Sequence, residues 1–218
     1  MVAPRPIIAF TVVYLLAGAS SRAFAQDGMA GMDHSKHRMG PEIVIPKGAL
    51  YTKADVEFMQ GMIAHHAQAI AMARLAPSHG AGQAVLTLTG RIINAQNDEI
   101  RLMQQWLRDR LQPVPEAKPG PMRMKMDGME HEMLMPGMLT EEQMRQLDAA
   151  RGREFDRLFL TGMIQHHNGA VSMVKQLFDT YGAAQDEMVF KFASDVNIDQ
   201  TTEIARMEKM LTALLLNP

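Results

Sequence analysis

Two segments of the chain repeat each other, and this duplication constrains the fold more than any other feature of the sequence. Residues 55–66 read DVEFMQGMIAHH and align without gaps on residues 156–167, which read DRLFLTGMIQHH. Five downstream positions also correspond, namely Gln96, Glu99, Ile100, Met103 and Leu107 with Gln200, Glu203, Ile204, Met207 and Leu211. The chain of 218 residues is therefore expected to contain two copies of one structural unit.

Each copy has the hydrophobic spacing of a helical hairpin. In the first copy, Phe58, Met62, His65, Ala69 and Met72 recur every three or four residues, as on one face of a helix. An amphipathic hairpin cannot bury its apolar face alone. Two copies therefore predict an all-α four-helix bundle. No strand pattern is recognised in the chain.

The helix ends carry recognisable signals. Thr52 followed by Asp55, and Thr140 followed by Gln143, have the pattern of capping boxes at helix starts. The later two helices of the bundle are expected near residues 154–179 and 186–216.

Composition divides the chain into five segments. We expect a signal peptide at 1–25, a flexible Met/His-rich segment at 26–48, the first hairpin at 49–111, a flexible Met-rich linker at 112–138 and the second hairpin at 139–218. The leader combines Arg5, an apolar run and an Ala-x-Ala site that ends at Ala25. The run is shorter than the ~20 residues of a membrane span. A periplasmic or secreted mature chain without stable membrane insertion is expected.

The mature chain is mildly acidic and has no cysteine. Removal of the leader takes away Arg5 and Arg22, which leaves 20 Lys and Arg against 24 Asp and Glu, a net charge of −4. No basic stripe is available for phosphates, so nucleic acid is not expected as a partner. Cysteine ligands and disulfides are excluded, whereas methionine is abundant with 21 residues.

Methionine and histidine occupy matching positions in both copies. Met62 precedes His65 and His66 by three and four residues, so the thioether and the imidazoles share one side of a helix. Met72 lies two turns further along, and Met103 of the partner helix can close the site. Soft thioethers with imidazoles favour Cu(I), with Cu(II) and Ag(I) as further candidates. The candidate ligands are Met62, His65, His66, Met72, Met103, Met163, His166, His167, Met173 and Met207.

Two other stretches concentrate the same side chains. The segment before the first hairpin carries Met29, Met32, His34, His37 and Met39 within eleven positions. The linker has seven methionines and one histidine within the seventeen residues 122–138. Both stretches are expected to bind additional copper loosely.

The repeated motifs resemble the CopM-like family of exported, two-repeat, ferritin-like proteins, long catalogued as a domain of unknown function. The resemblance spans residues 52–216 and rests on Met-Ile-x-His-His in both copies and the later Gln-x-x-Glu-Ile-x-x-Met. It implies a four-helix bundle, periplasmic copper binding, a role in copper tolerance, and metal ligands at Met62, His65, His66, Met72, Met103 and their counterparts. The first copy has Met59-Gln60 where the second has Leu160-Thr161, so the two sites are expected to differ in affinity.

Other function classes compete with copper sequestration, transfer or resistance. In a structural or adaptor bundle, the methionines would fill the core and the histidines would form hydrogen bonds within it. A ferritin-like oxidase would need inward carboxylates that include two Glu-x-x-His pairs. The residues three positions after Glu99 and Glu203 are instead Leu102 and Arg206, so no enzymatic activity is expected. Copper or silver ions and a periplasmic copper-transport protein are the expected partners.

Overall fold

The computed structural model describes residues 42–126 and 129–216, which belong to one compact unit, Gly40–Pro218. Its helices are α1 (Lys53–Leu75), α2 (Gln83–Asp109), α3 (Glu141–Ala149), α4 (Gly152–Asp179) and α5 (Glu187–Leu216). The predicted signal peptide lies outside the described residues. So do the methionines and histidines of residues 29–39, which are predicted to bind additional copper. None of the helices within 42–126 and 129–216 is long and apolar enough to cross a membrane.

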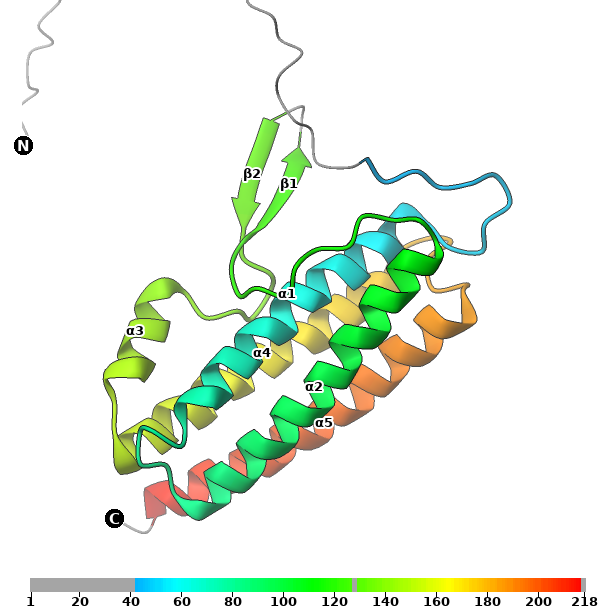
Figure 1. Ribbon diagram of the computed structural model, residues 1–218. Helices are drawn as coiled ribbons and strands as arrows, with labels where there is room; N and C mark the ends of the chain where they lie inside the picture. Colours follow the sequence, from blue (N-terminus) through cyan, green and yellow to red (C-terminus); the bar gives the residue numbers. More distant parts are fainter. Residues whose placement is uncertain (1–41, 127–128, 217–218) are drawn as a thin grey trace, which may run out of the picture. The chain divides into compact units, whose positions relative to one another are not determined.

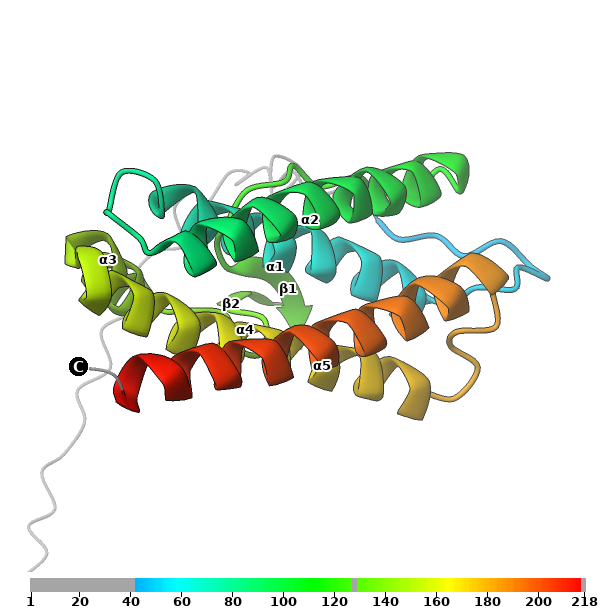
Figure 2. The same ribbon diagram turned by 90° about the horizontal axis from the view of Figure 1, so that it is seen from below.

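Four of these helices form the predicted bundle (Figure 1). Helices α1 and α2 make one hairpin, α4 and α5 make the other, and the two hairpins pack together mainly through α1 and α4. Helices α2 and α5 run along the same side of the bundle (Figures 1 and 2). The all-α architecture built from duplicated hairpins is therefore confirmed.

Capping boxes begin α1 and α3, as the sequence predicts. The Asp55 carboxylate accepts a hydrogen bond of 2.7 Å from the Thr52 amide, and the Thr52 hydroxyl accepts one from the Asp55 amide. Thr140 and Gln143 form the same reciprocal pair. Helix α3 is a separate short helix that packs on α1 and α4.

The linker contains two short strands, and the expectation that the chain has no strand is wrong here. Strand β1 (Met122–Met126) pairs antiparallel with β2 (Met129–Met133). The register pairs Met122 with Met133, Arg123 with Glu132, Met124 with His131, Lys125 with Glu130 and Met126 with Met129. Methionine and charged residues alternate with a period of two, which is a strand pattern.

Candidate metal centre

Two pairs of adjacent histidines meet where α1 packs on α4. His65 and His66 come from α1, His166 and His167 come from α4, and none of the four is exposed to solvent (0 % each). The ring centroids of His65 and His166 are 3.8 Å apart. Within each pair the centroids are 6.4 Å and 6.2 Å apart. The duplication thus brings equivalent residues of the two copies together in the dry centre of the bundle.

Two of these rings use Nε2 to reach backbone oxygen. His65 Nε2 lies 3.0 Å from the Pro136 carbonyl oxygen, and His166 Nε2 lies 3.0 Å from the carbonyl oxygen of His65 itself. A carbonyl oxygen can only accept, so each Nε2 carries the proton and donates it. The proton therefore sits away from Nδ1, whose lone pair is left available.

The other two rings use Nε2 to reach carboxylates. His66 Nε2 lies 2.7 Å from Glu99 Oε2, and His167 Nε2 lies 2.7 Å from Glu203 Oε2. The His167 contact is a well-aligned hydrogen bond, whereas the His66 contact has the distance of a hydrogen bond without its alignment. The two copies therefore share a histidine–glutamate contact that differs in quality.

The remaining ring nitrogens share one property. Within the part of the chain that the structure describes, the Nδ1 atoms of all four histidines are buried without a hydrogen-bond partner. Metal-binding histidines characteristically donate their other ring N–H to a carboxylate or a backbone carbonyl, which fixes the tautomer and orients the ring. This arrangement matches that requirement at His65, His166 and His167, and His66 has the distance of such a contact to Glu99 without its alignment.

The two central rings are neutral at pH 7. Burial, followed by the nearby His66, lowers the pKa of His65 from 6.5 to about 3. Burial, followed by the nearby His65, lowers the pKa of His166 well below 6.5. A metal ion needs the neutral imidazole as its ligand, so this environment keeps both rings in the binding form.

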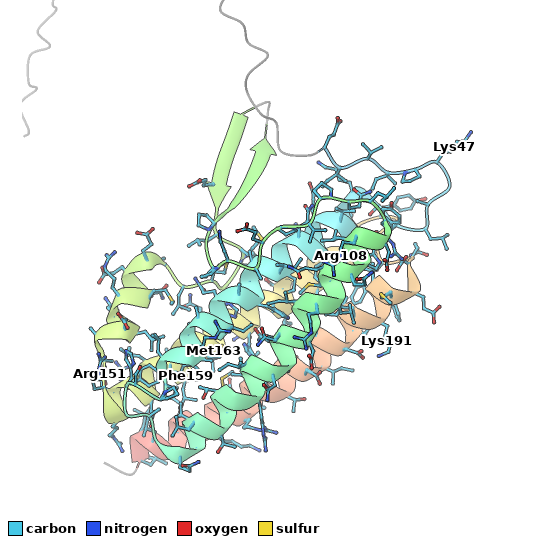
Figure 3. All side chains as sticks on the ribbon, in the orientation of Figure 1. Lys47, Arg108, Arg151, Phe159, Met163 and Lys191 are labelled. Carbon is cyan, nitrogen blue, oxygen red and sulfur yellow. The ribbon has the colours of Figure 1, made fainter. Side chains whose placement is uncertain are left out.

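All six methionines predicted as ligands are buried, and the structure groups them across the two copies. Met62 and Met103 of the first copy share a core cluster with Met173 of the second. Conversely, Met163 and Met207 share the other cluster with Met72. Figure 3 shows Met163 in the interior of the bundle, whereas Arg108 and Lys191 extend outwards. Met62 and Met72 of the first copy, which the spacing in the sequence groups together, thus lie in different clusters. Each cluster combines methionines from both copies.

A close backbone approach positions the linker over this centre. A Cβ at Gly169 of α4 would collide with the Pro136 carbonyl and lie 2.6 Å from the Gly137 Cα. Gly137 itself has a φ of 76°, which favours glycine. At the equivalent position of α1, Gln68 holds the linker through two hydrogen bonds, donating to the Leu139 carbonyl (2.9 Å) and accepting from its amide (2.7 Å). These contacts place the Pro136 carbonyl beside His65.

A cavity of about 200 Å³ lies between α2 and α5, and its lining includes Glu99 and Glu203. Both glutamates occupy matching positions in the two copies, and the sequence alone gives them no role as partners of the histidines. Their retention in register was the signal that could have identified them as partners of the histidines. Asp199 lines the same cavity, where burial and the nearby Glu99 raise its pKa.

Nitrogen and oxygen ligands alone do not form a complete metal site in this geometry. Within residues 42–126 and 129–216, no three or more His, Asp or Glu side chains are arranged to hold a metal ion. An ion bound by the histidine Nδ1 atoms would therefore need the buried thioethers as further ligands.

The fold and centre define a class of protein: a duplicated helical hairpin that closes over paired histidines and buried methionines. The chain belongs to the DUF305 family, whose model, described as a domain of unknown function, matches residues 55–211. This membership and the likeness to solved CopM structures confirm the resemblance stated from the repeated motifs.

Solved structures share the fold over most of their length. A DUF305 fragment from Deinococcus radiodurans is 29% identical, with a TM-score of 0.62 over 75% of this chain and 98% of that chain. A DUF305 protein from Streptomyces coelicolor, named as a candidate secreted protein, is 27% identical, with a TM-score of 0.63 over 74% and 93%. CopM, solved in Cu(I)-bound and Cu(II)-bound forms, is 27% identical, with a TM-score of 0.55 over 73% and 96%. CopM has also been solved with Ag and in the apo form. No functionally curated protein matches the sequence.

Proposed function

We propose that the buried histidine and methionine core binds a soft monovalent ion, Cu(I) or Ag(I), and that the protein sequesters or transfers copper in the periplasm or outside the cell. The observation that carries this proposal is the set of four buried Nδ1 atoms that lack a hydrogen-bond partner among the described residues. An unpaired buried polar atom costs about 1–3 kcal/mol. A bound metal ion would remove that cost.

The chemistry of the surrounding side chains favours a soft ion. Each of the two buried core clusters contains three of the predicted methionines. Thioethers select Cu(I), and imidazole accepts copper generally. Mg²⁺ and Ca²⁺ would require oxygen ligands instead. Copper is cargo in this proposal, and its exchange needs only stepwise replacement of ligands, without acid–base catalysis.

The family relationship supports the same function. CopM shares the fold and has been solved with both copper and silver bound. The predicted leader would export the chain, and copper transfer would require a periplasmic copper-transport partner. The β1–β2 hairpin adds five methionines and His131 at alternating positions of paired strands, where they could capture further ions.

A structural or adaptor bundle is the competing function. In such a bundle the histidines would exist to satisfy polar groups of the core. Within the described chain, His65, His166 and His167 instead satisfy only one ring nitrogen each, and His66 makes no well-aligned hydrogen bond. His79 is the contrasting case: its Nδ1 lies 2.9 Å from Ser78 Oγ and its Nε2 lies 2.9 Å from the Asp148 carbonyl oxygen.

An anaerobic Cu(I) competition titration against a chromophoric chelator tests the proposal. The mature chain, residues 26–218, is compared with a His65→Gln/His166→Gln double variant and with His79→Gln. We expect the double variant to lose at least the ~10-fold in affinity that removal of an outer-shell partner costs. His79→Gln should bind like the wild type. Equal binding by all three proteins would place the ion elsewhere, and no competition by the wild type would favour the structural bundle.

A further inference from the structure

The cavity between α2 and α5 has features of a second site that neither the histidines nor the thioethers explain. Its polar lining consists mainly of Gln96 and Glu99 from α2, and of Asp199, Gln200, Glu203 and Arg206 from α5. Three carboxylates thus face one guanidinium. The cavity volume of about 200 Å³ leaves room for several water molecules, each of which occupies ~30 Å³ in the liquid.

The two glutamines provide an independent indication of a ligand. Gln96 and Gln200 are only 2 % and 4 % exposed. Within the described chain, both amide atoms of Gln96 and the amide oxygen of Gln200 have no hydrogen-bond partner. Buried amides are normally paired, because an unmade hydrogen bond leaves their desolvation uncompensated. Water molecules bound to a cation could donate to the amide oxygens of Gln96 and Gln200, and a water molecule further from the ion could accept from the Gln96 amide nitrogen.

We propose that this vestibule, the cavity lined by Gln96, Glu99, Asp199, Gln200, Glu203 and Arg206, binds a hydrated divalent cation of the Mg²⁺ or Mn²⁺ type, because its three carboxylates outweigh the single guanidinium. Such ions bind through one or two carboxylates and keep several of their water molecules. This mode does not require three protein ligands on the ion, and within the described residues no three His, Asp or Glu side chains are grouped to hold a metal ion directly. The carboxylates supply the charge, and the buried amides order the water shell.

The vestibule is asymmetric although the two copies line it together. Gln96 and Glu99 are matched by Gln200 and Glu203, but Asp199 stands where the first copy has Ala95. Glu99 and Glu203 contact His66 and His167, whereas Asp199 lines the vestibule without such a histidine contact. Asp199 is therefore the residue at which the cation site can be changed without altering the histidine partners.

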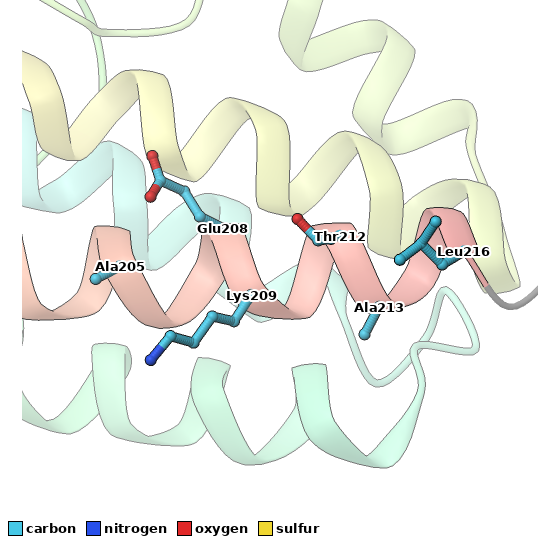
Figure 4. Close-up of a pocket in the computed structure, with 6 residues that line it drawn as sticks. All are labelled: Ala205, Glu208, Lys209, Thr212, Ala213 and Leu216. Carbon is cyan, nitrogen blue, oxygen red and sulfur yellow. The ribbon is translucent and has the colours of Figure 1, made fainter.

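The vestibule also adjoins the histidine core, because Glu99 and Glu203 contact His66 and His167. A cation held there would share Glu99 and Glu203 with the histidines. Binding of the hydrated cation does not rest on the proposed function. A second hollow, of about 550 Å³ and lined by α5 alone, has one glutamate, one lysine and no glutamine or histidine in its lining (Figure 4).

Mn(II) binding to the mature chain, followed by electron paramagnetic resonance at pH 7, tests the vestibule. Asp199→Asn removes one carboxylate with little change in shape, and Ala95→Phe fills the cavity from α2. We expect Asp199→Asn to weaken Mn(II) binding by roughly tenfold, as for loss of one charge beside a partly exposed divalent ion. We expect Ala95→Phe to abolish the same binding event.

Two variants outside the cavity serve as controls. Asp179→Asn removes the same charge from an exposed carboxylate of α4 that pairs with Lys175, and Ala205→Phe adds the same bulk at the hollow in Figure 4. Both should bind Mn(II) like the wild type. If the wild type does not bind Mn(II), or if Asp199→Asn binds it equally well, the proposed cation site is wrong. If the wild type binds Mn(II) but not Cu(I), only the proposed function is wrong.

Discussion

The imidazole rings of His65 and His166 lie against each other across the α1–α4 interface, with their centroids 3.8 Å apart and their planes tilted by 38°. The two residues are joined a second time, because His166 Nε2 donates to the His65 carbonyl oxygen. His65 Nε2 cannot repeat this contact and donates to Pro136 instead. The pseudo-symmetry of the copies is therefore broken at the centre, and the linker completes the environment of one ring only.

Gly169→Ala tests how strongly the linker depends on close approach to α4. The added Cβ would collide with the Pro136 carbonyl, so the linker must move and the hydrogen bond to His65 is lost. We expect the free energy of unfolding in urea to fall by about 1–3 kcal/mol, the usual cost of overpacking.

Gly90→Ala is the matched control for this substitution. Gly90 is also helical, and a Cβ there would meet nothing within 4 Å. Alanine should stabilise this helix position by up to ~1 kcal/mol. Equal effects of Gly90→Ala and Gly169→Ala would show that helix propensity, and not linker contact, governs position 169.

Replacing methionine by leucine separates ligand chemistry from packing. Met62→Leu and Met163→Leu remove a thioether with little change in volume, so the cost in stability should stay below ~1.5 kcal/mol. We expect weaker Cu(I) binding in both variants, measured by chelator competition. Met59 is the control, because it is equally buried and its counterpart in the second copy is already leucine, Leu160. If Met59→Leu weakens binding as much as Met62→Leu, the methionines act through packing.

Glu203→Gln tests the carboxylate that orients His167. The amide can still reach His167 Nε2, but it is a weaker acceptor than the carboxylate it replaces. We expect Cu(I) affinity to fall ~10–100-fold, the usual range for loss of an outer-shell partner. Glu99→Gln should have a smaller effect, because its contact with His66 is poorly aligned. The reverse order of the two effects would contradict the assigned geometry.

The β1–β2 hairpin is expected to increase the number of metal ions bound per chain without affecting the affinity of the tightest site. Replacing Met122, Met124, Met126, Met129 and Met133 by glutamine removes its thioethers and keeps the side-chain length. We expect fewer Ag(I) ions per chain in native mass spectrometry, with the tightest binding unchanged. Arg123→Gln with Lys125→Gln alters the same strand without removing a metal ligand and should keep the stoichiometry. Unchanged Ag(I) stoichiometry in the methionine variant would exclude the hairpin as a capture segment.

Much of the fold could be predicted because the sequence repeats it. The copied Met-Ile-x-His-His and the 3–4 spacing around Phe58 identify equivalent helices, and local capping at Thr52 and Thr140 marks where helices start. The hairpin was missed although its signal is present. Methionine alternates with charged residues on both sides of Asp127-Gly128, a dipeptide typical of two-residue hairpin turns.

The arrangement of the centre could not be obtained from spacing within one helix. Spacing places Met62 and Met72 on the same face, but the crossing of α1 and α4 assigns them to different core clusters. The contact of His65 with Pro136 joins residues 71 positions apart and depends on the small size of Gly169. Such relationships follow from tertiary packing, which the periodicity of a single helix does not encode.

The buried central rings make the stability of the metal-free protein depend on pH. The folded-state pKa of His65 is about 3 and that of His166 is also lowered, against 6.5 for an ordinary histidine. As the pH falls below 6.5, the unfolded chain takes up protons that the folded chain does not, so the free energy of unfolding decreases. Each ring contributes up to ~1.4 kcal/mol per pH unit, and the two together up to ~2.7.

Urea denaturation between pH 7.5 and pH 5.5 should therefore show constant stability above pH 6.5 and a decline below it. The window lies above the ordinary range of carboxylates, so the decline reports mainly on histidine. The His65→Gln/His166→Gln variant should have a flatter profile, because neither glutamine titrates. A wild-type profile as flat as that of the variant would mean that the two rings take up protons in the folded state. They would then not be held in the neutral form that metal binding requires.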